Sequence, residues 1–157
     1  MTKLSKHFTL EELTASSTAA RLGISNTPTT FEIEHAKKYL IPGIESIREL
    51  LDKPMLISSG FRSKQLNKST PGSSNTSQHV LFEAVDFTSP EFGSVLDVAS
   101  KILYSDIKFD QLIYEYGAWV HISFSSKSRR SVLSKYTGTS YLTGLVDKNG
   151  KSIIKGK

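Results

Sequence analysis

The pattern of apolar positions along the chain predicts two longer helices. The main one runs from Phe31 to Leu51, where apolar residues recur at close to helical spacing. Pro42 lies inside this pattern, and because proline removes a backbone donor, we expect a kink or a break near Leu40 to Gly43. A second helical pattern follows Ser89-Pro90-Glu91 and continues to Leu103, which would place proline in its first turn.

Capping residues predict two short helices. Thr9 is followed three residues later by Glu12, the spacing of a capping box, so a helix should begin after Thr9. Ser63 precedes Lys64–Lys68 and can cap a short helix there. The stretch from Thr14 to Thr30 is rich in Ser, Thr, Asn and Pro, and we interpret it as an ordered loop that includes a turn of helix.

Alternation of apolar and polar residues predicts the strands. Residues 119–124 alternate strictly, which is typical of a half-buried strand, and with residues 109–116 they predict a hairpin around Gly117-Ala118. Residues 55–62 have the pattern of a strand that leads into a turn. Residues 84–87 have that of a strand that follows a polar loop.

Length and composition limit the class of protein. The chain has 157 residues, which suits one domain. It has no cysteine, so disulfides and thiolate metal sites are excluded, and any metal must be held by His, Asp or Glu. It lacks the apolar core of a signal peptide and any run of membrane-spanning length. We therefore expect a protein made in the cytoplasm without membrane insertion, and we favour a monomer.

The net charge is +5, and much of the excess follows Lys127. Such a charge would favour an anionic partner, such as nucleic acid, a membrane or a bacterial wall polymer, or would simply keep the surface soluble. We expect no nucleic-acid partner, because no interleaving of aromatic and basic residues accompanies the charge. In the same region, residues 141–146 and 151–154 flank the turn signal Asn149-Gly150, which predicts a peripheral hairpin or an arm that reaches a partner.

Two histidines and one aspartate are candidate metal ligands. His79 follows a long polar loop and lies seven residues before Asp86, at the start of a predicted strand, while His121 lies in the alternating strand. Two imidazoles and one carboxylate could hold zinc and leave its fourth position open, which is the arrangement of catalytic zinc sites. Zinc suits this set of ligands best, although manganese, cobalt or nickel can occupy similar ligands.

A hydrolytic site also needs a carboxylate that accepts a proton, and the candidates are Glu115, Asp110 and Glu83. Side chains alternate between the faces of a sheet, so the length of the hairpin turn ranks these candidates. A two-residue turn at Gly117-Ala118 would separate Glu115 from His121, whereas a three-residue or bulged turn would place both on one face. Asp110 would share the face of His121 only if the turn had two residues. Glu83 is offset by three from the candidate aspartate ligand and should face away from the metal.

Such a site needs a donor for a developing oxyanion or for a substrate carboxylate as well. Arg62 is the leading candidate, because it closes the segment Ser59-Gly60-Phe61-Arg62 and its planar fork suits a carboxylate or a carbonyl. Ser77 lies two residues before His79 and could position a substrate group.

Three motifs in this order resemble those of a known family. They are Ser59-Gly60-Phe61-Arg62, Ser77-x-His79-x-x-Phe82-x-Ala84-x-Asp86 and Trp119-x-His121. They are similar to motifs of the zinc-dependent D-alanyl-D-alanine carboxypeptidases, a family that includes phage endolysin peptidases and shares its fold with the Hedgehog signalling domain. Residues 4–13, 20–28 and 109–115 resemble its phage and prophage branch. The resemblance implies that zinc is bound by His79, Asp86 and His121, that Arg62 binds substrate, and that Glu115 is the base.

The resemblance also implies an α+β fold, with an antiparallel sheet, helices packed on one face and the metal in a cleft across the other. We expect residues 1–126 to form the zinc peptidase domain and residues 127–157 to be a basic C-terminal extension of the same domain. The implied activity is hydrolysis of peptide bonds in the peptide stems of bacterial peptidoglycan, by a D,D-carboxypeptidase or an endolysin-type endopeptidase. Without a signal peptide, such an enzyme would reach the cell wall after release from the cytoplasm, or would be carried in a virion.

Two residues depart from the family pattern. Phe82 stands where the family has glycine, and a bulky residue tolerates positive φ poorly, so we expect either a rebuilt loop or a phenylalanine that forms a wall of the cleft. Ala118 stands where many relatives carry an acidic residue, so Glu115 must supply the base or the base is missing. The alternative function is a zinc-stabilised wall-binding or virion structural module, weakly active or inactive, in which Phe82 has closed the cleft.

Overall fold

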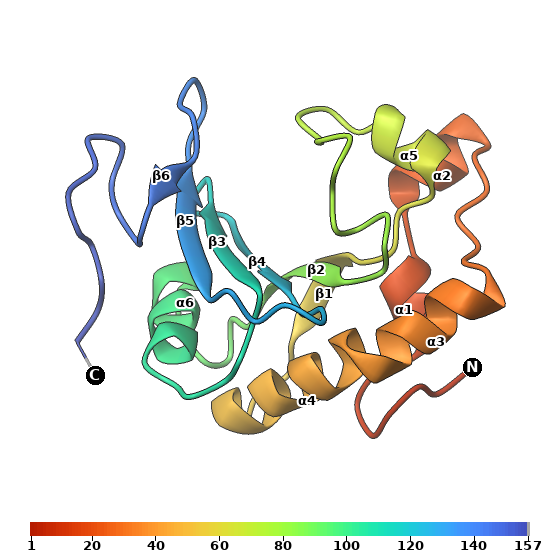
Figure 1. Cartoon of the computed structure of the whole chain (residues 1–157), viewed down its shortest axis with the longest axis horizontal. Coiled ribbons are helices and arrows are strands. Elements are labelled where there is room, and N and C mark those ends of the chain that lie inside the picture. The colour runs from red at the N-terminus through yellow and green to blue at the C-terminus, as the bar shows by residue number, and fades with distance from the viewer. Residues whose placement is uncertain (157) are drawn as a thin grey trace.

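The computed structural model describes residues 1–156 and contains one six-stranded sheet (Figure 1). Its strands are β1 (Leu56–Ser59), β2 (Ala84–Thr88), β3 (Gln111–Glu115), β4 (Trp119–Ser123), β5 (Ser131–Lys135) and β6 (Leu142–Thr143). Their order in the sheet is β1-β2-β4-β3-β5-β6. Neighbours are antiparallel except for β3 and β5, which are parallel. The predicted α+β fold is confirmed, with this one parallel pair added.

Six helices accompany the sheet: α1 (Leu10–Thr14), α2 (Ser17–Leu22), α3 (Thr30–Lys38), α4 (Leu40–Leu51), α5 (Lys64–Lys68) and α6 (Val95–Leu103). Alternate side chains of the central strands, among them Leu112, Val120 and Ile122, are fully buried in one core with the apolar faces of α4 and α6. α4 comes very close to the end of β4, since a Cβ added at Gly43 would lie 2.3 Å from the Phe124 ring. Among the described residues, no helix is both long and apolar enough to cross a bilayer.

The predicted caps and the predicted break are confirmed. Thr9 and Glu12 form a capping box at α1, and the Ser63 hydroxyl accepts a hydrogen bond at the start of α5. The long helical pattern is interrupted at Tyr39, where α3 ends and α4 begins. Pro42 therefore lies in the first turn of α4, where a backbone N–H has no partner within the helix and its loss costs little.

The helix predicted to open at Ser89-Pro90-Glu91 begins later, and this prediction was wrong. α6 starts at Val95, because Ser94 and Asp97 form a capping box: the Ser94 hydroxyl accepts from the Asp97 N–H at 3.0 Å, and the Asp97 carboxylate accepts from the Ser94 N–H at 2.9 Å. Residues 17–22, expected as a loop with one turn of helix, form α2, which is capped by Ser16.

The segment after Ser125 adds two strands to the sheet. β5 lies beside β3 in parallel, and β6 pairs with β5. A bridge between Val146 and Ser152 closes the turn at Asn149-Gly150, as the peripheral hairpin alternative expected. The side chain of Arg130 is held inside this region: it donates to the carbonyls of residues 103, 105 and 107 near the end of α6, and its guanidinium lies 4.6 Å from the centre of the Phe109 ring.

Candidate metal centre

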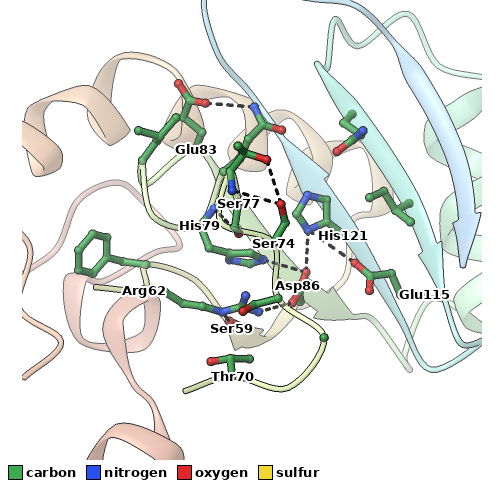
Figure 2. A pocket seen from close by; sticks show the side chains of 18 of the residues that line it. Ser59, Arg62, Thr70, Ser74, Ser77, His79, Glu83, Asp86, Glu115 and His121 are labelled. Atoms are coloured by element: carbon green, nitrogen blue, oxygen red, sulfur yellow. Dashed lines mark hydrogen bonds and ion pairs between the residues drawn. The ribbon is translucent and has the colours of Figure 1, made fainter. Parts of the chain in front are cut away.

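The structure brings His79, Asp86 and His121 together in one pocket (Figure 2). By the strand register, Asp86 and His121 point to the sheet face opposite the core formed with α4 and α6. Each offers one ligand atom, and these atoms all lie within 4.8 Å of one another. Asp86 of β2 lies directly across from His121 of β4 in the strand register. The Asp86 Oδ1 atom is 3.0 Å from Nδ1 of His121 and 3.3 Å from Nε2 of His79. Among residues 1–156, this is the one group of three or more such side chains with ligand atoms so close.

The His79 ring is oriented by the backbone around it. Its Nδ1 lies 2.6 Å from the Gly60 carbonyl oxygen, to which it donates, and this leaves Nε2 with a free lone pair directed toward Asp86. The His79 carbonyl accepts from the N–H groups of Arg62 at 3.1 Å and Phe82 at 3.2 Å. A metal-binding histidine needs a hydrogen bond at its other ring nitrogen, which here is the bond from Nδ1 to Gly60. That bond fixes the tautomer and the direction of the ligating nitrogen.

The charges of the group also suit a cation. Burial lowers the pKa of His79, and the neighbouring Asp86 carboxylate only partly offsets this, so the imidazole is neutral near pH 7. Burial raises the pKa of Asp86, but its interactions with His79 and His121 lower that pKa more, well below its usual range. A neutral imidazole beside an ionised carboxylate is the protonation state that metal ligands require. The residues present therefore fit a divalent cation with one coordination position left open.

Glu115 shares the face of these three side chains. In the hairpin, Ile113 lies across from His121 and Glu115 across from Trp119, so the turn consists of the three residues 116–118. This is the odd-length turn that a base at Glu115 requires. Its Oε1 atom lies 3.8 Å from Nδ1 of His121. Burial, and then the charge of Asp86, raise the pKa of Glu115, which makes its carboxylate a better proton acceptor.

The other two candidate carboxylates are occupied elsewhere. Glu83 lines the same cleft, but it accepts from His35 at 2.7 Å. Asp110 accepts from the Nε of Arg129 at 2.7 Å. Neither carboxylate has a hydrogen bond or ion pair with the three candidate ligands, whereas Glu115 lies 3.8 Å from the Nδ1 atom of His121.

Arg62 and Ser77 both line the cleft beside the candidate ligands. One Nη atom of Arg62 lies 3.5 Å from the Asp86 carboxylate, its Nε donates to Ser59 at 3.2 Å, and its other Nη donates to Asn67 at 3.4 Å. The Ser77 hydroxyl accepts from the His79 N–H at 3.2 Å, so it supports the turn that carries the histidine.

Phe82 does not form a wall of the cleft, so this expectation was wrong. Its ring is fully buried, 5.3 Å from the Phe61 ring centre, and does not line the cleft. The residue adopts a positive φ of 57°. Burial of the ring in the core offsets the backbone strain that this φ imposes on a bulky residue.

The candidate ligands lie in a cleft of about 950 Å³. Hydroxyl side chains from the start of α2 and from residues 70–77 form much of its lining, and Tyr116, Trp119 and Tyr141 form an aromatic part. Neither Tyr116 nor Tyr141 was predicted from the sequence as a site residue. Tyr116 could have been found from its place in the hairpin turn, whereas Tyr141 reaches the cleft only because the distant pairing of β5 with β3 brings β5 and β6 to this edge of the sheet.

Comparison with known proteins agrees with this geometry. No curated protein matches the chain. A model of the peptidase M15 family matches residues 6–123, a segment that contains all three candidate ligands, Arg62 and Glu115. The match covers most of the chain, and the chain therefore belongs to the peptidase M15 family, whose members resemble zinc D-Ala-D-Ala carboxypeptidases.

Proposed function

We propose that this protein is a zinc metallopeptidase that hydrolyses peptide bonds in the peptide stems of bacterial peptidoglycan. The observation that carries the proposal is the meeting of His79, Asp86 and His121 within 4.8 Å, with the Glu115 carboxylate beside them in an open cleft. Membership of a peptidase family supports the reaction class. The action on peptidoglycan, as a D,D-carboxypeptidase or an endopeptidase, follows the resemblance of the motifs.

His79, Asp86 and His121 would hold the zinc ion through Nε2, Oδ1 and Nδ1. When bound, zinc supplies a Lewis acid that polarises the substrate carbonyl and lowers the pKa of a water molecule to about 7. The bond from His79 to Gly60 keeps the imidazole directed into the site, and burial keeps it neutral.

Glu115 would be the general base and then the general acid. Burial and the charge of Asp86 raise its pKa, so its carboxylate is a better acceptor for the proton of the attacking water, which it would then pass to the leaving amine. Its Oε1 atom lies 3.8 Å from the His121 Nδ1 atom, beside the residues that would hold the zinc ion.

Arg62 would orient the substrate. Its guanidinium lies at the cleft wall next to Asp86, with bonds to Ser59 and Asn67 that hold its plane in place. A carbonyl or carboxylate of the substrate would exchange for the long 3.5 Å contact with Asp86. The hydroxyl-rich lining from residues 70–77 offers further donors and acceptors for an extended peptide.

The test is digestion of purified peptidoglycan by the zinc-loaded protein, followed by mass spectrometry of the muropeptides. Loss of a terminal D-alanine would identify a carboxypeptidase, and cleavage at a cross-link or within the stem would identify an endopeptidase. Unchanged muropeptides, with about one zinc bound per chain, would contradict the proposal and favour the non-catalytic module. That alternative depended on Phe82 closing the cleft, and the buried position of its ring removes this argument.

A further inference from the structure

Five polar side chains form a continuous chain of hydrogen bonds beside the loop that carries His79. We name this chain the Gln78 bridge, and its members are His35, Gln78, Glu83, Asp110 and Arg129. His35 lies 2.7 Å from one oxygen of Glu83, and Arg129 donates to both oxygens of Asp110, through Nε at 2.7 Å and Nη2 at 3.0 Å. The bridge therefore joins α3, the His79 loop, the start of β3 and the segment before β5.

Gln78 connects the two halves of the bridge. Its Nε2 donates to Glu83 at 3.0 Å and to Asp110 at 2.9 Å. The orientation of the amide follows from chemistry, since carboxylates only accept and the amide nitrogen is the only donor of the side chain. The opposite atom, Oε1, is buried without a hydrogen-bond partner among the described residues. The glutamine thus leaves one polar atom unsatisfied while both carboxylates are bonded.

The two carboxylates could not stay buried without these partners. Glu83 is 8% exposed and Asp110 only 1%, and an unpaired charge at such positions is strongly destabilising. Burial raises the pKa of Asp110, but the hydrogen bonds from Arg129 and Gln78 lower that pKa more, so the carboxylate stays ionised. The side chain of Arg129 is itself 55% exposed and forms the outer end of the bridge.

The bridge encloses the candidate ligand. Gln78 and Glu83 flank residues 79–82, and the Glu83 N–H donates to the Gln78 carbonyl at 2.9 Å, which closes this short loop. Gln78 directly precedes His79, so the position of its side chain sets the backbone from which the imidazole reaches Gly60 and Asp86. Partners of metal ligands of this kind affect metal affinity about 10- to 100-fold.

We propose that the Gln78 bridge positions His79 for metal binding, with Gln78 and Arg129 as its positioning residues. Arg129 comes from outside residues 6–123, which match the family, so the C-terminal segment takes part in the metal site of this protein. The inference uses only one part of the proposed function, the binding of a divalent cation.

The test measures zinc affinity of the full chain by competition with a chromophoric chelator, without any substrate. Arg129→Ala and Gln78→Met should weaken zinc binding about 10-fold or more. Arg129→Lys should restore part of the loss, because it returns the charge but not the two-point bond. Lys148→Ala, which removes one positive charge from an exposed turn, is the matched control and should bind zinc as the wild type does.

A second measurement separates positioning from general stability. The melting temperature of each variant is compared in excess chelator, and a variant that melts like the wild type yet binds zinc more weakly supports the proposal. If the wild type binds zinc and both Arg129→Ala and Gln78→Met bind it with the same affinity, this inference alone is overturned. A wild-type protein that binds no zinc would overturn the proposed function together with it.

Discussion

The carboxylate of Glu115 lies 3.8 Å from Nδ1 of His121, on the face of the sheet that holds the candidate ligands. The relationship depends on the three-residue turn between β3 and β4. Gly117 and Tyr116 both adopt positive φ there, at 64° and 57°. A turn shorter by one residue would direct Glu115 to the helical face, so the turn decides whether this site has a base.

Glu115→Gln should abolish most hydrolysis while zinc binding persists. Glutamine keeps the shape of the side chain but cannot accept the proton, and loss of a general base lowers kcat/KM about 100- to 10,000-fold. The assay is release of muropeptide products at saturating zinc. Glu49→Gln, on the exposed side of α4, is the control and should keep full activity. Full activity of Glu115→Gln would show that another group acts as the base.

Lys135→Met should move the acid limb of the pH–rate profile to higher pH. Burial and the charge of Asp86 raise the pKa of Glu115, and the charge of Lys135 on the neighbouring strand lowers it. Without Lys135 the pKa of Glu115 rises further, so a larger fraction of the base is protonated at any pH below neutrality. The profile of kcat/KM against pH measures this shift. An acid limb that stays in place or moves to lower pH would show that the charge of Lys135 does not lower the pKa of the catalytic base.

Phe82→Gly should destabilise the fold although it restores the family residue. Loss of a buried phenylalanine side chain costs about 3–5 kcal/mol, whereas relief of the positive φ returns only about 1–2 kcal/mol. Urea unfolding of the chelated protein should therefore show a net loss of about 1–4 kcal/mol, from the same two effects. Phe31→Ala, at an exposed site on α3, should change the free energy of unfolding far less. A more stable Phe82→Gly variant would mean that strain outweighs packing at this position.

Arg130→Gln should lower stability without changing wall binding. Its guanidinium donates to three backbone carbonyls near the end of α6, and hydrogen bonds from charged groups each contribute about 1.5–3 kcal/mol.

Lys148 and Lys151 are exposed, so their double alanine variant should show the opposite pattern to Arg130→Gln. Its retention on peptidoglycan should be weaker and less salt-dependent, while its free energy of unfolding should not change. Sedimentation with purified walls and urea unfolding distinguish the two. Equal retention of all variants would show that the basic segment does not anchor the protein.

Local signals in the sequence predicted much of this structure. The capping box at Thr9, the cap at Ser63 and the break before Pro42 depend on residues a few positions apart, and each formed as expected. The capping box at Ser94 was an equally local signal, and Pro90 concealed it because proline is also common in the first turn of a helix. The motifs around His79 and His121 pointed to one site because each motif requires specific residue types at a few closely spaced positions.

Long-range relationships could not be predicted in the same way. The parallel pairing of β5 with β3 has no signal in the segment that contains it, and the contact of Arg129 with Asp110 depends on that pairing. The buried position of the Phe82 ring could not be predicted without knowing that it packs against the Phe61 ring. Glu115 was an intermediate case. The face of the sheet to which its side chain points depends on the length of the turn between β3 and β4, and the sequence was compatible with a turn of two or three residues.

The position of β5 has a consequence for any shortened form of this protein. β5 lies between β3, the strand that ends at Glu115, and β6. A polypeptide ending at residue 126 would leave β3 with a bare row of backbone donors and acceptors along its outer border. Such borders recruit strands from other molecules, so the fragment should self-associate in solution even if its ligands still meet.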